Sequence, residues 1–205
     1  IQTKDAVIYR VKENLLDILT SFNNNLQFIC GMFLGFVTTM RVTHATPSPW
    51  YAHSANRRWE CESAMPDNVT CKDIARQLVE DLPGKDLKVI LGGGRQTLVT
   101  NVTATPTDPL DTWSCRRKDG RDLIKEYIKD KESRGLKYNV VKNNKELNSL
   151  NFNETDYLLG MDKSPEGMPS LSDMVEAAIK VLQKNDKGYI LMVNNPLHLM
   201  YRFFR

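Results

Sequence analysis

The stretch VTTMRVTHATPSPWYAHSANRR, residues 37–58, decides how this chain folds and where its functional residues gather. It opens as a β-branched run typical of a strand and then reaches Pro47-Ser48-Pro49, which cannot continue a ladder of strands. His44 and Thr46 come where the strand should end, and Arg57 follows in the loop. Ligands of open α/β sheets bind beyond the carboxyl ends of the strands. The stretch therefore predicts an oxyanion or metal site made of an imidazole, a hydroxyl and a guanidinium.

Each of these residues also has an ordinary structural interpretation. A threonine after a strand is commonly a turn residue, and an arginine near the start of a helix is commonly solvated. The prediction therefore depends on the three groups meeting at one edge of the sheet and on no single residue.

Short apolar segments alternate with amphipathic helical segments over the rest of the chain. The expected strands are residues 87–91, 138–141, 157–159 and 189–193, and helices are expected to begin near residues 70, 119, 145 and 170. Thr70 with Asp73, and Ser170 with Asp173, have the spacing of capping boxes. Several strands are apolar throughout, which is typical of a parallel sheet covered on both faces. The predicted fold class is therefore α/β, a three-layer sandwich with a mainly parallel central sheet.

A glycine run, Gly92-Gly93-Gly94-Arg95, follows the expected strand 87–91. It matches neither the GxGxxG nor the GxxxxGK[ST] pattern of nucleotide-binding loops. A tight approach of two backbones at the sheet is the favoured interpretation, and a different enzyme that binds a nucleotide here is the alternative.

Composition limits the classes of protein to which the chain can belong. The 205 residues are 41% hydrophobic, enough for one domain with a sizeable core. Lys and Arg number 28 against 25 Asp and Glu, and no basic run with interleaved aromatic residues stands out, so nucleic acid is not the expected partner. The longest apolar stretch, residues 26–37, is too short to span a bilayer. Residues 100–118, rich in Thr, Pro and Asp, are predicted to form a surface loop.

Cysteines and sequons point to the secretory pathway. None of the four cysteines has CxxC spacing, and Cys61 and Cys71 are close enough to bridge, although the pairing stays open. Three sequons predict glycosylation at Asn68, Asn101 and Asn153. Together they predict an extracellular or cell-surface glycoprotein, in which disulfides persist.

Four blocks of sequence resemble the alkaline phosphatases of animals, the insect enzymes in particular, and they occur in that family's order. They are VTTMRVTHATPSPWYAHSANRRWE (37–60), CKDIARQLVED (71–81), KVILGGGRQTL (88–98) and PSLSDMVEAAIKVLQKNDKGYILMV (169–193). The resemblance covers residues 35–193 as a partial alkaline phosphatase-like domain. It leaves residues 1–34 as an unassigned N-terminal segment and residues 194–205 as a divergent tail.

The resemblance implies hydrolysis of phosphate monoesters through a phosphoserine, with two zinc ions and one magnesium ion at the carboxyl ends of the strands. It makes Arg57 the clamp on phosphate, Thr46 a magnesium ligand, and His44 a neighbour of that ion acting through water. It makes Cys71 a disulfide cysteine. The implied partner is a phosphate monoester or inorganic phosphate, while a homodimer and a lipid anchor in the full-length protein stay open.

The departures from the family pattern concern catalysis. Residues 1–34 hold no Asp-Ser-Ala motif for the nucleophile, Asn194 stands where the resemblance places a magnesium-ligating glutamate, and the zinc ligands are absent from these 205 residues. We therefore expect this chain to have little or no activity. The alternative is a non-catalytic secreted glycoprotein, a remnant of the fold that binds phosphate through Arg57.

Overall fold

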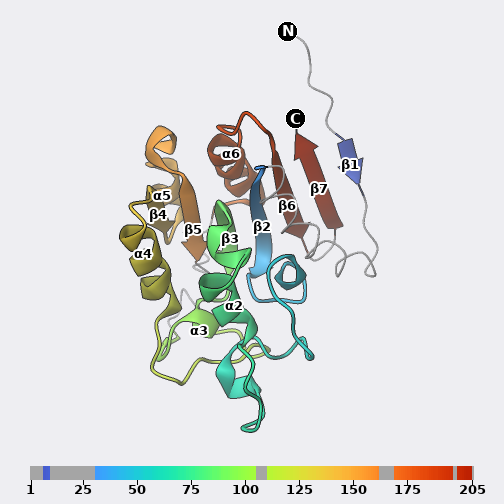
Figure 1. Ribbon diagram of the computed structural model, residues 1–205, viewed down its shortest axis with the longest axis vertical. Helices are drawn as coiled ribbons and strands as arrows, with labels where there is room; N and C mark the ends of the chain where they lie inside the picture. Colours follow the sequence, from blue (N-terminus) through green and yellow to red (C-terminus); the bar gives the residue numbers. More distant parts are fainter. Residues whose placement is uncertain (1–6, 10–30, 105–109, 162–168, 196–197, 205) are drawn as a thin grey trace.

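The computed structural model describes residues 7–9, 31–104, 110–161, 169–195 and 198–204. Its strands form one sheet in the order β1-β7-β6-β2-β3-β5-β4 (Figure 1). They are β1 (Val7–Tyr9), β2 (Phe33–Arg41), β3 (Val89–Gly93), β4 (Tyr138–Val141), β5 (Tyr157–Met161), β6 (Tyr189–Asn195) and β7 (His198–Phe204). The five strands β6, β2, β3, β5 and β4 are parallel to one another, which confirms the mainly parallel sheet. Most of segment 1–34 lies outside the described residues.

The tail after residue 193 departs from a purely parallel arrangement. Strand β7 pairs antiparallel with β6, and β1 pairs antiparallel with β7. The sequence analysis placed the last apolar strand at residues 189–193. The structure corrects this, because the tail forms one more strand, β7, beside β6.

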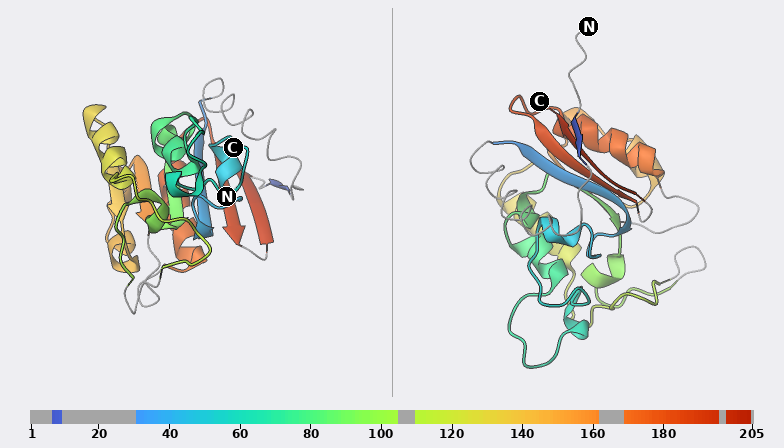
Figure 2. Two further views of the ribbon diagram at one scale, coloured as in Figure 1. Left: turned by 90° about the horizontal axis from the view of Figure 1, so that it is seen from below. Right: turned by 90° about the vertical axis from the view of Figure 1, so that its right-hand side faces the viewer.

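Helices cover both faces of the sheet, as Figure 2 shows. They are α2 (Ile74–Glu80), α3 (Arg95–Leu98), α4 (Leu123–Ser133), α5 (Asn144–Asn148) and α6 (Leu171–Leu182), with short 3-10 turns η2 (Ser48–Trp50), η3 (Glu62–Ala64), η4 (Gly84–Asp86) and η5 (Phe152–Glu154). None of the described helices has the length and apolarity needed to cross a bilayer.

Alternate residues of the five parallel strands supply two separate cores. Leu34 and Phe36 of β2 pack with α2 and α4, whereas Val37 packs with α5 and α6 on the opposite face. This alternation is the two-residue period of a strand, since successive side chains point to opposite faces. The predicted three-layer sandwich is confirmed.

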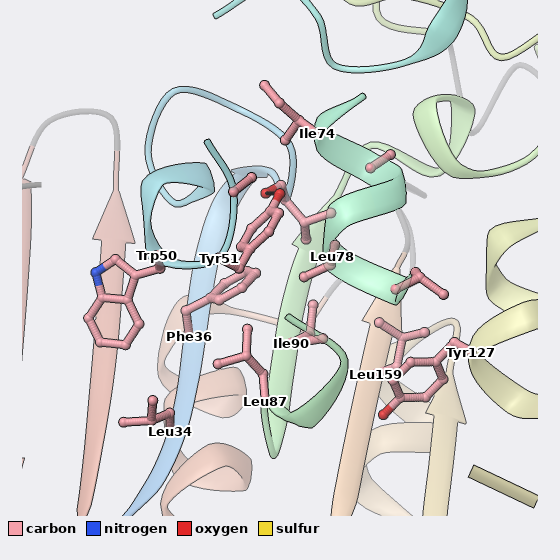
Figure 3. Packing of buried hydrophobic residues seen from close by; sticks show 14 of the residues in the cluster. Leu34, Phe36, Trp50, Tyr51, Ile74, Leu78, Leu87, Ile90, Tyr127 and Leu159 are labelled. Atoms are coloured by element: carbon pink, nitrogen blue, oxygen red, sulfur yellow. Dashed lines mark hydrogen bonds between the residues drawn. The ribbon is translucent and has the colours of Figure 1, made fainter. Parts of the chain in front are cut away.

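Two aromatic residues anchor the loop after β2 to the first of these cores. Trp50 and Tyr51 are buried beside Phe36 (Figure 3), and the Tyr51 and Phe36 rings stack with their centroids 6.0 Å apart. The loop that carries His44 is therefore held by apolar packing at its far end.

The glycine run after β3 is explained by close packing. A Cβ atom on Gly92 would lie 2.7 Å from Cγ2 of Thr38 and 2.9 Å from Cγ1 of Val42. Gly94 has φ +93°, a left-handed conformation that favours glycine, and it precedes the four-residue helix α3. The interpretation as a tight backbone approach is confirmed.

Of the two predicted capping boxes, one is confirmed and one is wrong. Ser170 and Asp173 cap α6 reciprocally. At α2 the N-cap is Asp73, whose carboxylate accepts from the Arg76 amide at 2.8 Å, so Thr70 lies outside the helix. The start of α2 is fixed by tertiary contacts, because its Ile74 amide donates to the Trp59 carbonyl at 2.9 Å.

Lys88, just before β3, lies between two aromatic rings. Its Nζ atom is 3.8 Å from the ring centroid of Tyr157 and 4.7 Å from that of Phe33. Burial lowers the pKa of Lys88 from 10.5 to about 8. The charged groups that act on it are Asp156, Asp86, Arg134 and Lys131.

Replacing Lys88 with methionine should therefore raise the free energy of unfolding at pH 7.5 by about 1–2 kcal/mol, a value already reduced for the partial exposure of the amine. The native pKa lies below the unfolded one, so the unfolded chain holds more protons between about pH 8 and 10.5. The loss of stability caused by the buried charge of Lys88 therefore disappears as pH rises from about 8 to 10.5. Urea unfolding of both proteins at pH 7.5, 9 and 10.5 tests this, with the exposed Lys129→Met as control. A constant difference at all three pH values would contradict it.

Candidate functional site

The carboxyl end of β2 leads into a loop that is fixed by hydrogen bonds. The His44 amide donates to the Arg41 carbonyl at 3.0 Å, and the Ser48 amide donates to the His44 carbonyl at 3.0 Å. The buried Tyr51 hydroxyl donates to the Val42 carbonyl at 2.7 Å. These contacts give the imidazole of His44 a defined place beyond the end of the strand.

A buried ion-pair network lies directly beneath this loop. Nε and Nη2 of Arg41 donate to the two carboxylate oxygens of Glu60 at 2.9 and 2.8 Å, and Nη1 donates to Asp111 at 2.6 Å. The Thr43 hydroxyl donates to Glu60 at 2.6 Å. Burial alone would lower the pKa of Arg41, but hydrogen bonds and the charges of both carboxylates raise it. Arg41 is therefore a structural cation whose charge is paired with two carboxylates.

A cavity of about 510 Å³ opens above this network. Its lining residues are Met40, Arg41, His44, Ala45, Arg57, Arg58, Glu60, Asp111 and Trp113. The structure thus brings together two of the three residues predicted from sequence, His44 and Arg57.

Arg57 and Arg58 give the cavity its capacity to bind anions. Both residues are exposed, and neither guanidinium forms an ion pair within the residues described. Three arginines and two carboxylates line the cavity, which leaves an excess of positive charge. A planar guanidinium donates two parallel hydrogen bonds to two oxygens of a phosphoryl or carboxylate group.

His44 is held in its neutral form at physiological pH. Burial lowers its pKa from 6.5, and the charges of Arg41 and Arg57 lower it further, whereas the charge of Glu60 and a hydrogen bond with the Thr46 backbone act in the opposite direction. Its buried Nδ1 atom has no hydrogen-bond partner among the described residues. The imidazole is therefore available to a water molecule or a ligand in the cavity.

Thr46 does not line the cavity, and its backbone lies close to both His44 and Asn194 of β6. Its carbonyl accepts a hydrogen bond from Nδ2 of Asn194 at 2.8 Å, and the same amide nitrogen lies 3.4 Å from Oγ1 of Thr38. Thr46 lines neither this cavity nor the neighbouring one of about 570 Å³ that Arg57 also lines.

Comparison with known proteins decides the family. The alkaline phosphatase family model matches residues 29–195. The chain belongs to the alkaline phosphatase family. It is 43% identical to the alkaline phosphatase of Gadus morhua over 80% of this chain and 36% of that protein. It is 39% identical to the membrane-bound alkaline phosphatase of Bombyx mori over 80% of this chain and 32% of that protein.

Solved alkaline phosphatases share the fold. The enzyme of Thermus thermophilus superposes with a TM-score of 0.56 at 26% identity, covering 86% of this chain and 30% of that one. The enzyme of the Antarctic bacterium TAB5 gives a TM-score of 0.53 at 20% identity, over 83% of this chain and 41% of that one. The chain spans about a third of the length of the relatives it matches in sequence.

The residues that the resemblance assigns to magnesium do not fit that ion as they stand. Magnesium takes hard oxygen ligands, mostly carboxylates and waters. Asn194 directs an amide N–H toward Thr46, and no group of three or more His, Cys, Asp or Glu side chains in the described ranges is placed to hold a metal. The role of Thr46 as a magnesium ligand stays a prediction.

The structure revises the expected disulfide of this alkaline phosphatase chain. Cys61 is joined to Cys115, and Cys71 is an exposed free thiol, so the assignment of Cys71 to a disulfide by resemblance stays a prediction. The Cys61–Cys71 bridge that the spacing allowed does not form. Asn68, Asn101 and Asn153 are exposed, and their glycosylation stays a prediction.

Sequence reasoning missed Glu60, Asp111 and Trp113. The first two contact Arg41 across 19 and 70 residues of sequence, a range that local patterns do not reach. A signal was nevertheless present: Arg41 ends a buried strand, and a buried arginine requires carboxylate partners.

Proposed function

We propose that the cavity beyond β2 binds the phosphoryl group of phosphate monoesters through Arg57, and that this chain is the phosphate-recognition part of an alkaline phosphatase-type phosphomonoesterase. The observation that carries the proposal is the contrast between two arginines of one cavity. Arg41 is ion-paired with Glu60 and Asp111, whereas Arg57 has no ion-pair partner among the described residues.

Arg57 and His44 have complementary roles in this proposal. The guanidinium of Arg57 holds two phosphoryl oxygens and offsets their charge. The neutral imidazole of His44 orients a water molecule or accepts a hydrogen bond through Nδ1. Family membership supports hydrolysis of monoesters by the whole protein, at the cell surface or outside the cell. The three exposed sequons support the same location.

Binding without turnover is the second candidate, and the composition of the cavity favours it for these 205 residues. No serine, threonine or cysteine lines the cavity among the described residues, so it offers no hydroxyl or thiol nucleophile. Phosphoryl transfer needs a nucleophile and a clamp on the attacking and leaving oxygens besides charge stabilisation. We therefore expect phosphate binding with little or no hydrolysis.

Replacing Arg57 with alanine should weaken the binding of inorganic phosphate about 10- to 100-fold, because a hydrogen bond to a charged group contributes roughly 1.5–3 kcal/mol. Isothermal titration calorimetry with inorganic phosphate measures this. Arg57→Lys should retain part of the affinity, since it keeps the charge and loses the paired geometry. The matched control is Arg95→Ala, which removes an exposed arginine outside the cavity. Equal affinities for the wild-type and Arg57→Ala proteins would refute the proposal.

A colorimetric phosphomonoesterase assay at alkaline pH, with zinc and magnesium added, separates the two candidates. The 205-residue chain should show little turnover above that of Arg57→Ala. Robust turnover by the wild-type chain would reject the expectation that the chain binds phosphate without hydrolysing it, but it would not contradict phosphate binding in the cavity.

A further inference from the structure

Trp113 has a large apolar side chain that is exposed to solvent at the rim of the cavity that Arg57 and His44 line. Its exposed fraction is 91%, and it lines the same cavity as Arg57 and His44. The other exposed large hydrophobic side chain described, Leu82, has an exposed fraction of 42% and lies outside that cavity. A single exposed hydrophobic side chain is common on protein surfaces, so it is the place of Trp113 on the cavity that Arg57 also lines that suggests a function.

The loop that carries Trp113 is firmly anchored. The buried side chain of Gln96 donates to the carbonyls of Asp111 and Cys115 at 2.9 and 3.2 Å, and its oxygen accepts from the Asp111 amide at 2.8 Å. The Trp113 amide donates to the Asp111 carboxylate at 2.9 Å. That carboxylate also binds Arg41, so the rim of the cavity is tied to the end of β2. The backbone on both sides of the indole is therefore fixed before any ligand arrives.

The chemical groups that line the cavity suit an aromatic phosphate ester. Arg57 offers charge to the phosphoryl group, and Trp113 offers a flat π-face to whatever is attached to it. The volume of about 510 Å³ lies within the usual range of roughly 300–1,000 Å³ for small-molecule sites. Aromatic rings stack on one another in offset or edge-to-face geometry, whereas a polyol chain gains little from such a face.

We infer that Trp113 is the platform on which the aromatic leaving group of a phosphate monoester stacks, so that the cavity selects aryl esters over alkyl esters. This inference rests on the proposed function, because it takes Arg57 as the partner of the phosphoryl group. Trp113 thereby acts on specificity and has no part in bond cleavage.

Calorimetric titration with phenyl phosphate, glycerol 2-phosphate and inorganic phosphate tests the inference. The wild-type chain should bind phenyl phosphate about tenfold more tightly than glycerol 2-phosphate, as expected for one stacking contact of this kind. Trp113→Ala should reduce this ratio to about one. Trp113→Phe should retain most of it, because a smaller π-face remains. Leu82→Ala, the control, should behave as wild type.

The outcomes separate the inference from the proposed function. The stacking role is overturned if the wild-type chain binds phenyl phosphate and glycerol 2-phosphate equally tightly, or if Trp113→Ala keeps the wild-type preference. Neither result contradicts phosphate binding in the cavity. Binding of phenyl phosphate that depends on Trp113, with no affinity for inorganic phosphate, overturns the role of Arg57 and supports the platform. Failure to bind any of the three ligands overturns both.

Discussion

Replacing Arg117 with methionine is expected to lower the free energy of unfolding by about 3–5 kcal/mol, the range for breaking a buried ion pair from one side. The Arg117 side chain is fully buried, and its Nη2 atom lies 2.8 and 2.9 Å from the two carboxylate oxygens of Asp73. Nε donates to the Thr97 carbonyl at 2.9 Å. Methionine keeps most of the apolar volume, so the loss measures removal of the cation from the buried Asp73 and from the more exposed Glu62 and Asp119, with which Nη1 of Arg117 also pairs.

The partner of Arg117 makes this ion pair matter for the fold. Asp73, whose side chain is 1% exposed, also caps α2 by accepting from the Arg76 amide. Burial raises the pKa of Asp73, and Arg117 opposes that rise. Without Arg117 the pKa of Asp73 should rise further, so the native state binds a proton that the unfolded state releases. The deficit of Arg117→Met should therefore shrink as pH falls from 7 toward 4.

Urea unfolding followed by circular dichroism measures the effect. The double variant Arg117→Met/Asp73→Asn should lose less stability than Arg117→Met alone, since the asparagine caps α2 without a buried charge. Arg116→Met is the matched control, because Arg116 is the neighbouring arginine and is exposed. Its effect should stay within about 0.5 kcal/mol. A loss for Arg117→Met no larger than that of the control would contradict the assignment.

Arg117 also shows where local patterns stop being informative. The stretch 100–118, of which residues 105–109 lie outside the described part, is predicted from its Thr, Pro and Asp content to be a surface loop, and that description fails at the buried Arg117. The ion-pair partner Asp73 lies 44 residues earlier. Amino-acid composition indicates the average polarity of a segment, but it does not reveal a single buried ion pair.

Elements that depend on contacts close in sequence were predictable. Strand β4 has the predicted bounds, and the capping box of α6 forms as its spacing requires. Both depend on residues within one turn or one strand. The start of α2 was misplaced because backbone bonds to residues 59 and 60 decide it, and those bonds are not visible in the local sequence.

The candidate site was predictable in its polar groups and not in its setting. The resemblance to alkaline phosphatases singled out His44 and Arg57, and the structure places both on one cavity. Asp111, which pairs with Arg41, and the exposed Trp113 come from a different loop, which Gln96 and the disulfide hold in place. Only the folded chain brings these loops together, so the apolar rim that suggests substrate preference was not predicted.

Replacing Asn194 with glutamate is expected to destabilise the metal-free protein by about 3 kcal/mol, because it would bury a charge and remove the hydrogen bond that Asn194 donates to the Thr46 carbonyl. Asn194 is 6% exposed, and its Nδ2 atom donates to the Thr46 carbonyl. A glutamate cannot donate this bond, so its negative charge would face the partial negative charge of the carbonyl. The amide is therefore matched to a site without a metal ion.

The same substitution should create a response to magnesium that the wild-type chain lacks. A carboxylate at residue 194 beside the Thr46 carbonyl would supply hard oxygen ligands, and an ion that binds only the folded state stabilises it by mass action. Thermal unfolding in EDTA and in millimolar magnesium chloride measures the shift. Asn194→Gln is the control, since it matches glutamate in length and carries no charge. Equal stabilisation of the wild-type, glutamine and glutamate proteins by magnesium would mean that the amide does not exclude the ion, because the charge at residue 194 would then have no effect on its binding.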